Sequence, residues 1–183
     1  MIVAQIIGIL AMLFNIWSYQ QKQQKFIIAF QLIGSTLFTI HFFMLNAYMG
    51  AILNAVGILR AVVFLKEDFF HSKHFLWIFA FISLFLGCYV LTFTAFKLPF
   101  TTANAFLEFL PVFGMTATTF AFHARSEKST RLLSLLSSPA WLTYNIIWFS
   151  IGAICCESFT IVSIAVGLLR FDLKKEKTEK EEK

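Results

Sequence analysis

The stretch FIIAFQLIGSTLFTIHFFMLNAYMGAILNAVGIL, residues 26–59, decides the fold because it carries no formal charge over 34 residues. A helix that crosses the hydrocarbon core of a membrane needs about 20 predominantly apolar residues. As a single helix, this stretch would be about 51 Å long at a rise of 1.5 Å per residue. It is too long for one crossing, so we expect a hairpin of two helices that turns near residues 46–50.

The positions of lysine support that division. As one crossing, the stretch would place Lys22 and Lys25 on one side of the membrane and Lys66 and Lys73 on the other. As two crossings, it places all four on the same side. Positive residues accumulate on the cytoplasmic side of membrane proteins, which favours two crossings. The same rule along the whole chain predicts seven helices with a periplasmic N-terminus and a cytoplasmic C-terminus, and leaves Lys97 outside as the exception among 15 Lys and Arg.

Composition points to the same class of protein. The chain is 58% hydrophobic and 14% charged, whereas a soluble domain has about 25% charged residues. The fold class is therefore an all-α integral membrane protein with seven transmembrane helices. The expected spans are residues 2–20, 26–45, 48–66, 75–95, 105–124, 132–151 and 156–173. The last ten residues, 174–183, alternate Lys with Glu and are expected to form a disordered cytoplasmic tail or a fraying extension of the last helix.

An internal repeat relates the two halves of the chain. The hexapeptide AVGILR at residues 55–60 recurs as AVGLLR at residues 165–170, and Gly8 and Lys22 have counterparts in Gly114 and Lys128. Matches that share their order and their charge positions favour a true repeat over chance.

The repeat predicts a 3+1+3 arrangement. A first three-helix unit covers residues 1–66, a linker helix with its flanking loops covers 67–104, and a second three-helix unit covers 105–173. Both units begin outside and end inside. Two parallel units of this kind are the architecture of SWEET-type transporters.

The stretch from His41 to Arg60, HFFMLNAYMGAILNAVGILR, resembles the YgjV family of bacterial inner-membrane proteins, as does the final helix leading into Arg170. The resemblance spans nearly the whole chain and implies a multi-pass protein of the bacterial inner membrane. That family is distantly similar to the SWEET and PQ-loop proteins, which carry proline in the first two helices of each unit. Here Pro111 and Pro139 fill these places in the second unit and are the expected hinges. The first unit lacks both.

Polar side chains inside a membrane are costly unless they face other helices or a wet cavity. His41 and Asn145 occupy matching places in the repeat, 104 residues apart, while Asn54 lies on the third expected helix and Ser163 on the seventh. We predict these four as substrate-binding residues, because their donors and acceptors suit a small neutral polar solute. Another interpretation stays open for each. An intramembrane Asn often joins helices by hydrogen bonds, and a neutral, hydrogen-bonded histidine fits position 41 equally well.

Charged residues at the expected helix ends have two interpretations each. Arg60 and Arg170 lie at matching inner ends, where they are expected either to contact lipid headgroups or to form a cytoplasmic gate. Glu108 and Glu157 are expected near the outer ends of the fifth and seventh helices, where each either contacts headgroups or water or carries a proton across the membrane.

The combined pattern favours a small-solute transporter or facilitator that works by alternating access. A non-transporting receptor or partner subunit of the same SWEET-like fold is the alternative. Neither H-E-x-x-H nor G-x-S-x-G occurs, so we expect no enzyme and no metal or other cofactor. The expected partners are membrane lipid and the solute, with a homo-oligomer also compatible. The formal net charge of +5 comes from Lys and Arg that flank the membrane and does not indicate nucleic acid binding.

Overall fold

The computed structural model describes residues 1–18, 24–65, 74–123 and 127–168. Within these ranges the chain forms seven α-helices and no strand, which confirms the all-α class and the number of helices. They are α1 (Ile2–Ser18), α2 (Gln24–Met44), α3 (Tyr48–Leu65), α5 (His74–Thr94), α6 (Thr102–His123), α7 (Glu127–Ile147) and α8 (Ile151–Gly167). The predictions for Arg170 and for the tail at 174–183 fall outside the described residues.

The uncharged stretch 26–59 folds as the expected hairpin, with α2 and α3 separated by three residues. The turn between α7 and α8 has the same geometry. Asn46 in the first turn and Phe149 in the second are left-handed, with φ of 60° and 54°. Four backbone hydrogen bonds around each of them match in position. The two turns are 103 residues apart. In this register His41 corresponds to Tyr144, one residue before the Asn145 that the sequence match suggested.

The seventh helix begins earlier than predicted. α8 starts at Ile151 where the expected span starts at residue 156, and α7 ends at Ile147 where the expected span ends at 151. The prediction kept the charge of Glu157 at the membrane surface. Because a three-residue turn is enough to reverse the chain here, Glu157 lies instead about one and a half turns inside α8.

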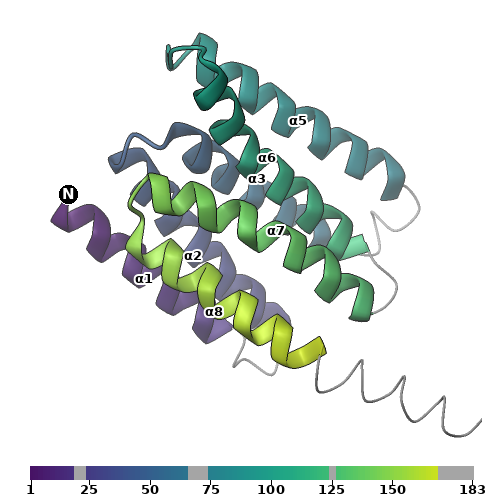
Figure 1. Cartoon of the computed structure of the whole chain (residues 1–183). Coiled ribbons are helices and arrows are strands. Elements are labelled where there is room, and N and C mark those ends of the chain that lie inside the picture. The colour runs from purple at the N-terminus through teal and green to yellow at the C-terminus, as the bar shows by residue number, and fades with distance from the viewer. Residues whose placement is uncertain (19–23, 66–73, 124–126, 169–183) are drawn as a thin grey trace, which may run out of the picture.

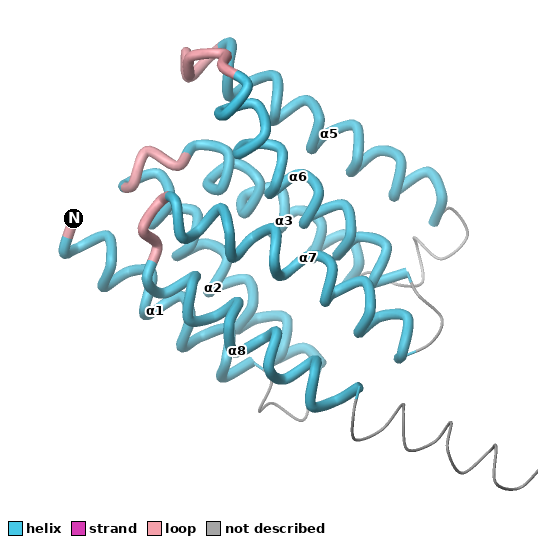
Figure 2. The backbone as a smooth tube through the Cα atoms, viewed as in Figure 1, coloured by secondary structure: helices cyan, strands magenta, loops and turns pink. Residues whose placement is uncertain are grey.

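Six helices are linked in a ring by their contacts, in the order α1, α2, α3, α6, α7, α8 and back to α1. α5 lies outside this ring and packs against α3 and α6. Figure 2 shows the described loops gathered at one end of the bundle, on the side where the N-terminus lies. We call this the loop end.

Aromatic side chains fill the space between α2 and α7. The ring centroid of Phe42 on α2 lies 6.4 Å from that of Trp141 and 6.2 Å from that of Tyr144, both on α7. Phe38 stacks on Phe42 at 5.9 Å. Offset and edge-on rings at these separations attract one another beyond the effect of burial alone, so this cluster forms the centre of the core.

The backbones of α1 and α8 touch at two glycines, Gly8 and Gly152. A Cβ placed on Gly152 would overlap the carbonyl group of Gly8 and would lie 2.7 Å from the amide nitrogen of Ile9. In a membrane, helices associate largely through close van der Waals packing, which small residues permit. The crossing of α1 and α8 therefore depends on the absent side chain at position 152.

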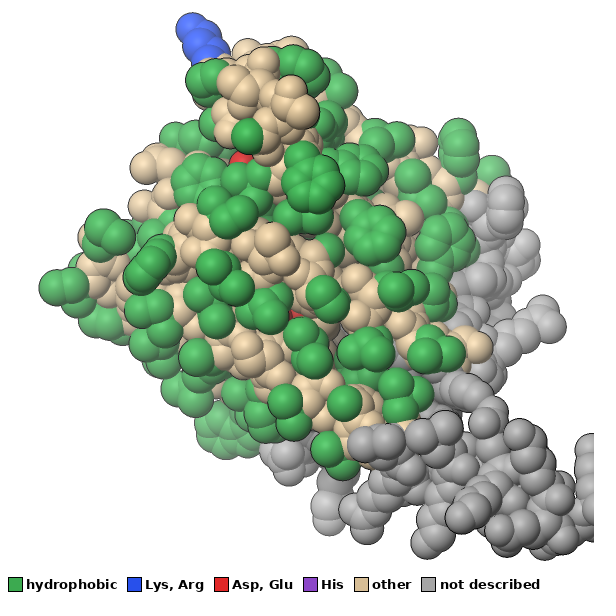
Figure 3. Space-filling view, in the orientation of Figure 1, with side chains coloured by type: hydrophobic (Ala, Val, Ile, Leu, Met, Phe, Trp, Pro, Cys, Tyr) green, Lys and Arg blue, Asp and Glu red, His purple; other side chains and the backbone are tan. Residues whose placement is uncertain are grey.

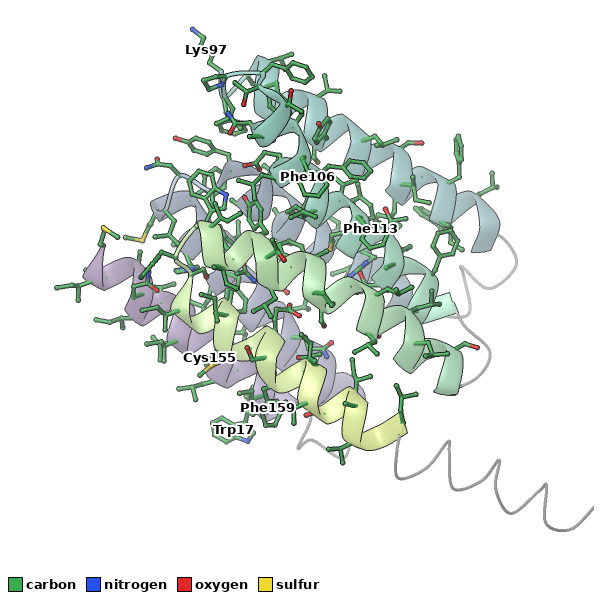
Figure 4. The ribbon with its side chains drawn as sticks, viewed as in Figure 1. Trp17, Lys97, Phe106, Phe113, Cys155 and Phe159 are labelled. Carbon is green, nitrogen blue, oxygen red and sulfur yellow. The ribbon has the colours of Figure 1, made fainter. Side chains whose placement is uncertain are left out.

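The outside of the bundle is apolar. By length and composition, Leu76–Thr94 of α5 is the one helix of the described chain that could span a membrane, and 28% of its best window is buried. Five further apolar helices are shorter. Figure 3 shows hydrophobic side chains spread across the described part of the visible face. Phe106, Phe113 and Phe159 are exposed on α6 and α8 (Figure 4). Exposed apolar surface this extensive is compatible with a lipid environment.

Candidate functional site

His41 is fully buried where α1, α2 and α8 meet at the loop end. Its Nδ1 lies 2.6 Å from the carbonyl oxygen of Ala4, and its Nε2 lies 2.7 Å from the hydroxyl of Ser150. Because a carbonyl oxygen only accepts, we assign the proton of the neutral ring to Nδ1, and Nε2 then accepts from the Ser150 hydroxyl. The ring packs on Gly8, where a Cβ would lie 2.8 Å from it. One side chain therefore joins three helices.

Tyr144, the counterpart of His41 on α7, makes the corresponding connection to α3. Its hydroxyl oxygen accepts a hydrogen bond of 3.0 Å from the backbone N–H of Gly50. Gly50 lies in the first turn of α3, where backbone N–H groups have no acceptor within the helix. Tyr144 thus caps the start of α3, while His41 contacts Ser150 at the start of α8.

Gln5 of α1 completes the contacts at the α7–α8 turn. Its Oε1 accepts from the N–H of Ile151 over 3.1 Å, and its Nε2 donates to the carbonyl of Phe149 over 2.7 Å. The amide side chain thereby satisfies one donor and one acceptor of a turn on which the chain reverses. Three side chains, Gln5, His41 and Tyr144, therefore hold the starts of α3 and α8.

Glu108 of α6 is a buried carboxyl group near the same end. It is 1% exposed, and its Oε2 has no hydrogen-bond partner. Tyr144 of α7 and Trp148 of the turn that follows direct their O–H and N–H groups toward it. The Trp148 Nε1 nevertheless forms no hydrogen bond. The expectation that Glu108 contacts headgroups or water is wrong, because α6 begins at Thr102 and places it about one and a half turns inside the bundle.

The four predicted substrate-binding residues lie in different surroundings. His41 is described above. Asn54 is half-buried and donates to the carbonyl of Gly50 in its own helix over 2.8 Å. Asn145 is buried with Oδ1 unbonded, and Ser163 is exposed on α8. In the described part of the chain, no hydrogen bond joins any two of the four. Because it is exposed, Ser163 faces the outside of the bundle.

The predicted hinge residues both lie inside helices, Pro111 in α6 and Pro139 in α7. Pro111 is buried and Pro139 is exposed. Proline has no N–H, so the carbonyl groups of Leu107 and Leu135 lose their helical donors. Each helix is weakened on one turn, and in α6 that turn also carries Glu108.

Arg60 packs between α3 and α6. It is 8% exposed, and one terminal nitrogen donates to the hydroxyls of Thr118 and Thr119 over 3.0 and 2.9 Å. The same nitrogen lies 3.3 Å from the carbonyl oxygen of Met115. The side chain holds two helices together in place of the expected headgroup contact, and a role at a gate stays a prediction.

Sequence reasoning missed Tyr144, Trp148, Ser150 and Gln5 as site residues. Tyr and Trp near the end of an apolar helix are typical of the membrane interface, which hid their inward contacts. The available signal was indirect. A helix that starts straight after a three-residue turn leaves its first N–H groups without acceptors, so polar residues of neighbouring helices must lie close to it.

Tyr144→Phe is expected to lower the free energy of unfolding by about 1–2 kcal/mol, because the buried N–H of Gly50 loses its acceptor while the ring stays. Tyr48→Phe is the matched control, since the Tyr48 hydroxyl bonds to Asn46 in an exposed position. Unfolding of both purified variants in SDS titrations measures the difference. Equal stability of the two variants would show that the bond to Gly50 contributes nothing.

Residues 2–175 match Imp-YgjV, a family described as bacterial inner membrane protein. The chain belongs to this family. The match covers every described helix and agrees with the resemblance seen in residues 41–60. No curated protein and no solved structure matches the chain. Family membership places the protein in the bacterial inner membrane, where the exposed apolar side chains of the bundle face lipid.

Proposed function

We propose that this member of the YgjV family is a small-solute transporter or facilitator that works by alternating access. The moving parts are two three-helix units, α1–α3 and α6–α8, with α5 as the linker helix. The N-terminus lies in the periplasm and the C-terminus in the cytoplasm, so the loop end faces outward. The solute is small, neutral and polar, and the protein has no enzymatic activity or cofactor of its own.

The helix contacts support two related units. Exchanging α1, α2 and α3 for α6, α7 and α8 turns the α1–α2 contact into α6–α7, α2–α3 into α7–α8, and α1–α8 into α6–α3. All six contacts belong to the ring. The turns of the two units also share their hydrogen-bond pattern. Such an exchange is expected for parallel repeats, and it is the basis for extending the likeness to SWEET-type proteins.

The observation that carries the proposal is a set of hydrogen bonds between the two units at the loop end, two of them made by Gln5 of the first unit to the α7–α8 turn. His41 of the first unit bonds Ser150 of the second, and Tyr144 of the second bonds Gly50 of the first. A hydrogen bond between membrane helices contributes about 0.6 kcal/mol on average. The four bonds together contribute about 2 kcal/mol on that average, which thermal motion can overcome, and this suits a gate.

A cross-link between the units tests this gate. Gln5→Cys with Ile151→Cys places thiols at two positions of the two units that a hydrogen bond joins, from the Ile151 backbone N–H to the Gln5 side chain, in a chain whose Cys88, Cys155 and Cys156 are replaced by Ala. Uptake of labelled sugars, polyols and amides into proteoliposomes is measured before and after a short, reducible bis-thiol cross-linker. We expect cross-linking to abolish uptake and reduction to restore it.

The control is Phe43→Cys with Tyr48→Cys, whose native rings lie 6.3 Å apart within the first unit. Cross-linking this pair is expected to leave uptake intact, because the units still separate. Undiminished uptake after complete cross-linking of the first pair would contradict the proposed movement. Absence of uptake for the whole panel would contradict transport of such solutes.

The alternative, a non-transporting receptor or partner subunit, is favoured by one feature, the aromatic cluster that fills the space between α2 and α7. A protein whose interior stays packed in every state would serve as a scaffold. Water accessibility of Phe42→Cys to a membrane-impermeant thiol reagent separates the two functions. Labelling indicates an opening interior, and complete protection favours the scaffold.

A further inference from the structure

Glu108 is the buried acidic group of the described loop end, and its surroundings determine its chemistry. The polar groups directed at it are the hydroxyl of Tyr144, on α7, and the indole N–H of Trp148, in the turn after α7. Both are neutral, and Oε2 has no hydrogen-bond partner. No basic side chain of the described residues forms an ion pair with the carboxyl group.

Among the described residues, the charged and titratable groups on the helices around α6 do not offset a negative charge on Glu108. From α5, Tyr89 faces it, but the Tyr89 hydroxyl donates to the carbonyl of Ala105 over 3.0 Å. From α3, the nearest charged residue is Arg60, which contacts α6 at Met115. Met115 lies about 10 Å further along the helix from Glu108 at 1.5 Å per residue. From α7 and the turn that follows it, the groups directed at Glu108 are the neutral Tyr144 and Trp148.

A carboxylate in such a place is expensive. Moving an ionised carboxyl group from water into a protein interior costs several kcal/mol even after relaxation, unless a cation or a full set of hydrogen bonds offsets the cost. A metal cation would need several oxygen ligands, whereas the groups aimed at Glu108 are N–H and O–H donors. A proton on the orphan oxygen removes the charge and needs no further ligand.

Glu108 is also connected to the loop-end gate. The hydroxyl oxygen of Tyr144 accepts the hydrogen bond from the Gly50 N–H. The hydroxyl hydrogen of Tyr144 is then free to point at Glu108. Separation of α7 from α3 would break the bond to Gly50 and admit water beside the carboxyl group. The surroundings of Glu108 therefore change whenever the gate moves.

We propose that Glu108 is a proton-binding site, occupied by a proton on Oε2 in the closed arrangement described here. This inference rests on the proposed function: the transporter exchanges this proton with the outside. When the loop end opens, the Oε2–H bond breaks and the proton passes to water. When the loop end closes, water returns a proton to Oε2 and the group is buried again as the neutral acid.

Infrared spectroscopy of the purified full chain in lipid nanodiscs tests the site without any solute. A protonated carboxyl group in an apolar site gives a carbonyl band distinct from that of a carboxylate. We expect this band at neutral pH, unchanged in position in Glu157→Gln and missing in Glu108→Gln. Glu157→Gln is the matched control because Glu157 lies at a similar depth in α8 and contacts Ser138.

Each outcome decides one claim. A neutral-pH spectrum of Glu157→Gln that lacks the band overturns the proton site, and this arm stands even where Glu108→Gln fails to fold. A band in Glu108→Gln equal to that of the native chain also overturns it. If the band behaves as expected while proteoliposomes take up no solute, the proton site stands and the transport function fails. If solute is taken up while the band is missing, transport stands and the proton site fails.

Discussion

Gly152→Ala is expected to destabilise the folded chain by about 2–3 kcal/mol and to lower its abundance in the membrane. The added methyl group would overlap the backbone of Gly8, and backbone atoms cannot rotate away as the end of a side chain can. Inserting a carbon into a closely packed contact typically costs about 1–3 kcal/mol. Because α1–α8 is a junction between the two proposed units, the effect should reach the whole ring.

Gly87→Ala is the matched control for this substitution. Gly87 also lies inside a helix, but a Cβ there meets no atom within 4 Å. Replacing a helical glycine by alanine gains about 1 kcal/mol when no clash opposes it. The two substitutions are thus expected to have opposite signs. Thermal unfolding followed by size-exclusion fluorescence measures both, and a Gly152→Ala protein as stable as Gly87→Ala would contradict the backbone contact.

His41→Ala is expected to cost about 4 kcal/mol. It removes a fully buried ring that touches α1 and it deprives the Ser150 hydroxyl of its acceptor. Truncation of a buried aromatic side chain to alanine costs about 3–5 kcal/mol, and an unsatisfied buried polar group adds to this. Ser150→Ala, which removes one hydrogen bond and leaves the ring in place, should cost about 1 kcal/mol.

Ser163→Ala serves as the reference for His41→Ala, because Ser163 was predicted as a site residue and lies exposed on α8. An exposed substitution of this kind usually changes stability by less than about 0.5 kcal/mol. Unfolding in SDS ranks the three variants. If His41→Ala is as stable as Ser163→Ala, His41 does not hold the helices together, and its conformation must serve another purpose.

The number and class of the helices followed from charge alone. The 34 uncharged residues at 26–59 are too many for one transmembrane helix. The lysines on either side of them required an even number of helices there. Boundaries were less certain at the second hairpin. The prediction started the seventh helix late in order to keep Glu157 at the membrane surface. In the structure α8 starts directly after a three-residue turn, and the Glu157 side chain is half-buried beside Ser138.

The candidate site was predicted in part. His41 and Asn145 were recognised as costly inside a membrane, and both are buried. Their partners were not foreseen, because Ala4 and Ser150 lie 37 and 109 residues away from His41 along the chain. Glu108 was assigned to the surface by a rule that charges lie at helix ends. That rule fails where helices pack around the side chain.

The sequence by itself determined that the chain is a helical membrane protein, because hydrophobic length and the placement of lysine depend on the bilayer and on no particular fold. Only the tertiary structure decided which polar groups meet. Side chains such as His41, Tyr144 and Glu108 find their partners on helices far away in sequence. Close backbone contacts, such as that of Gly8 with Gly152, set how these helices lie against one another in space. Such contacts leave almost no trace in hydropathy or charge.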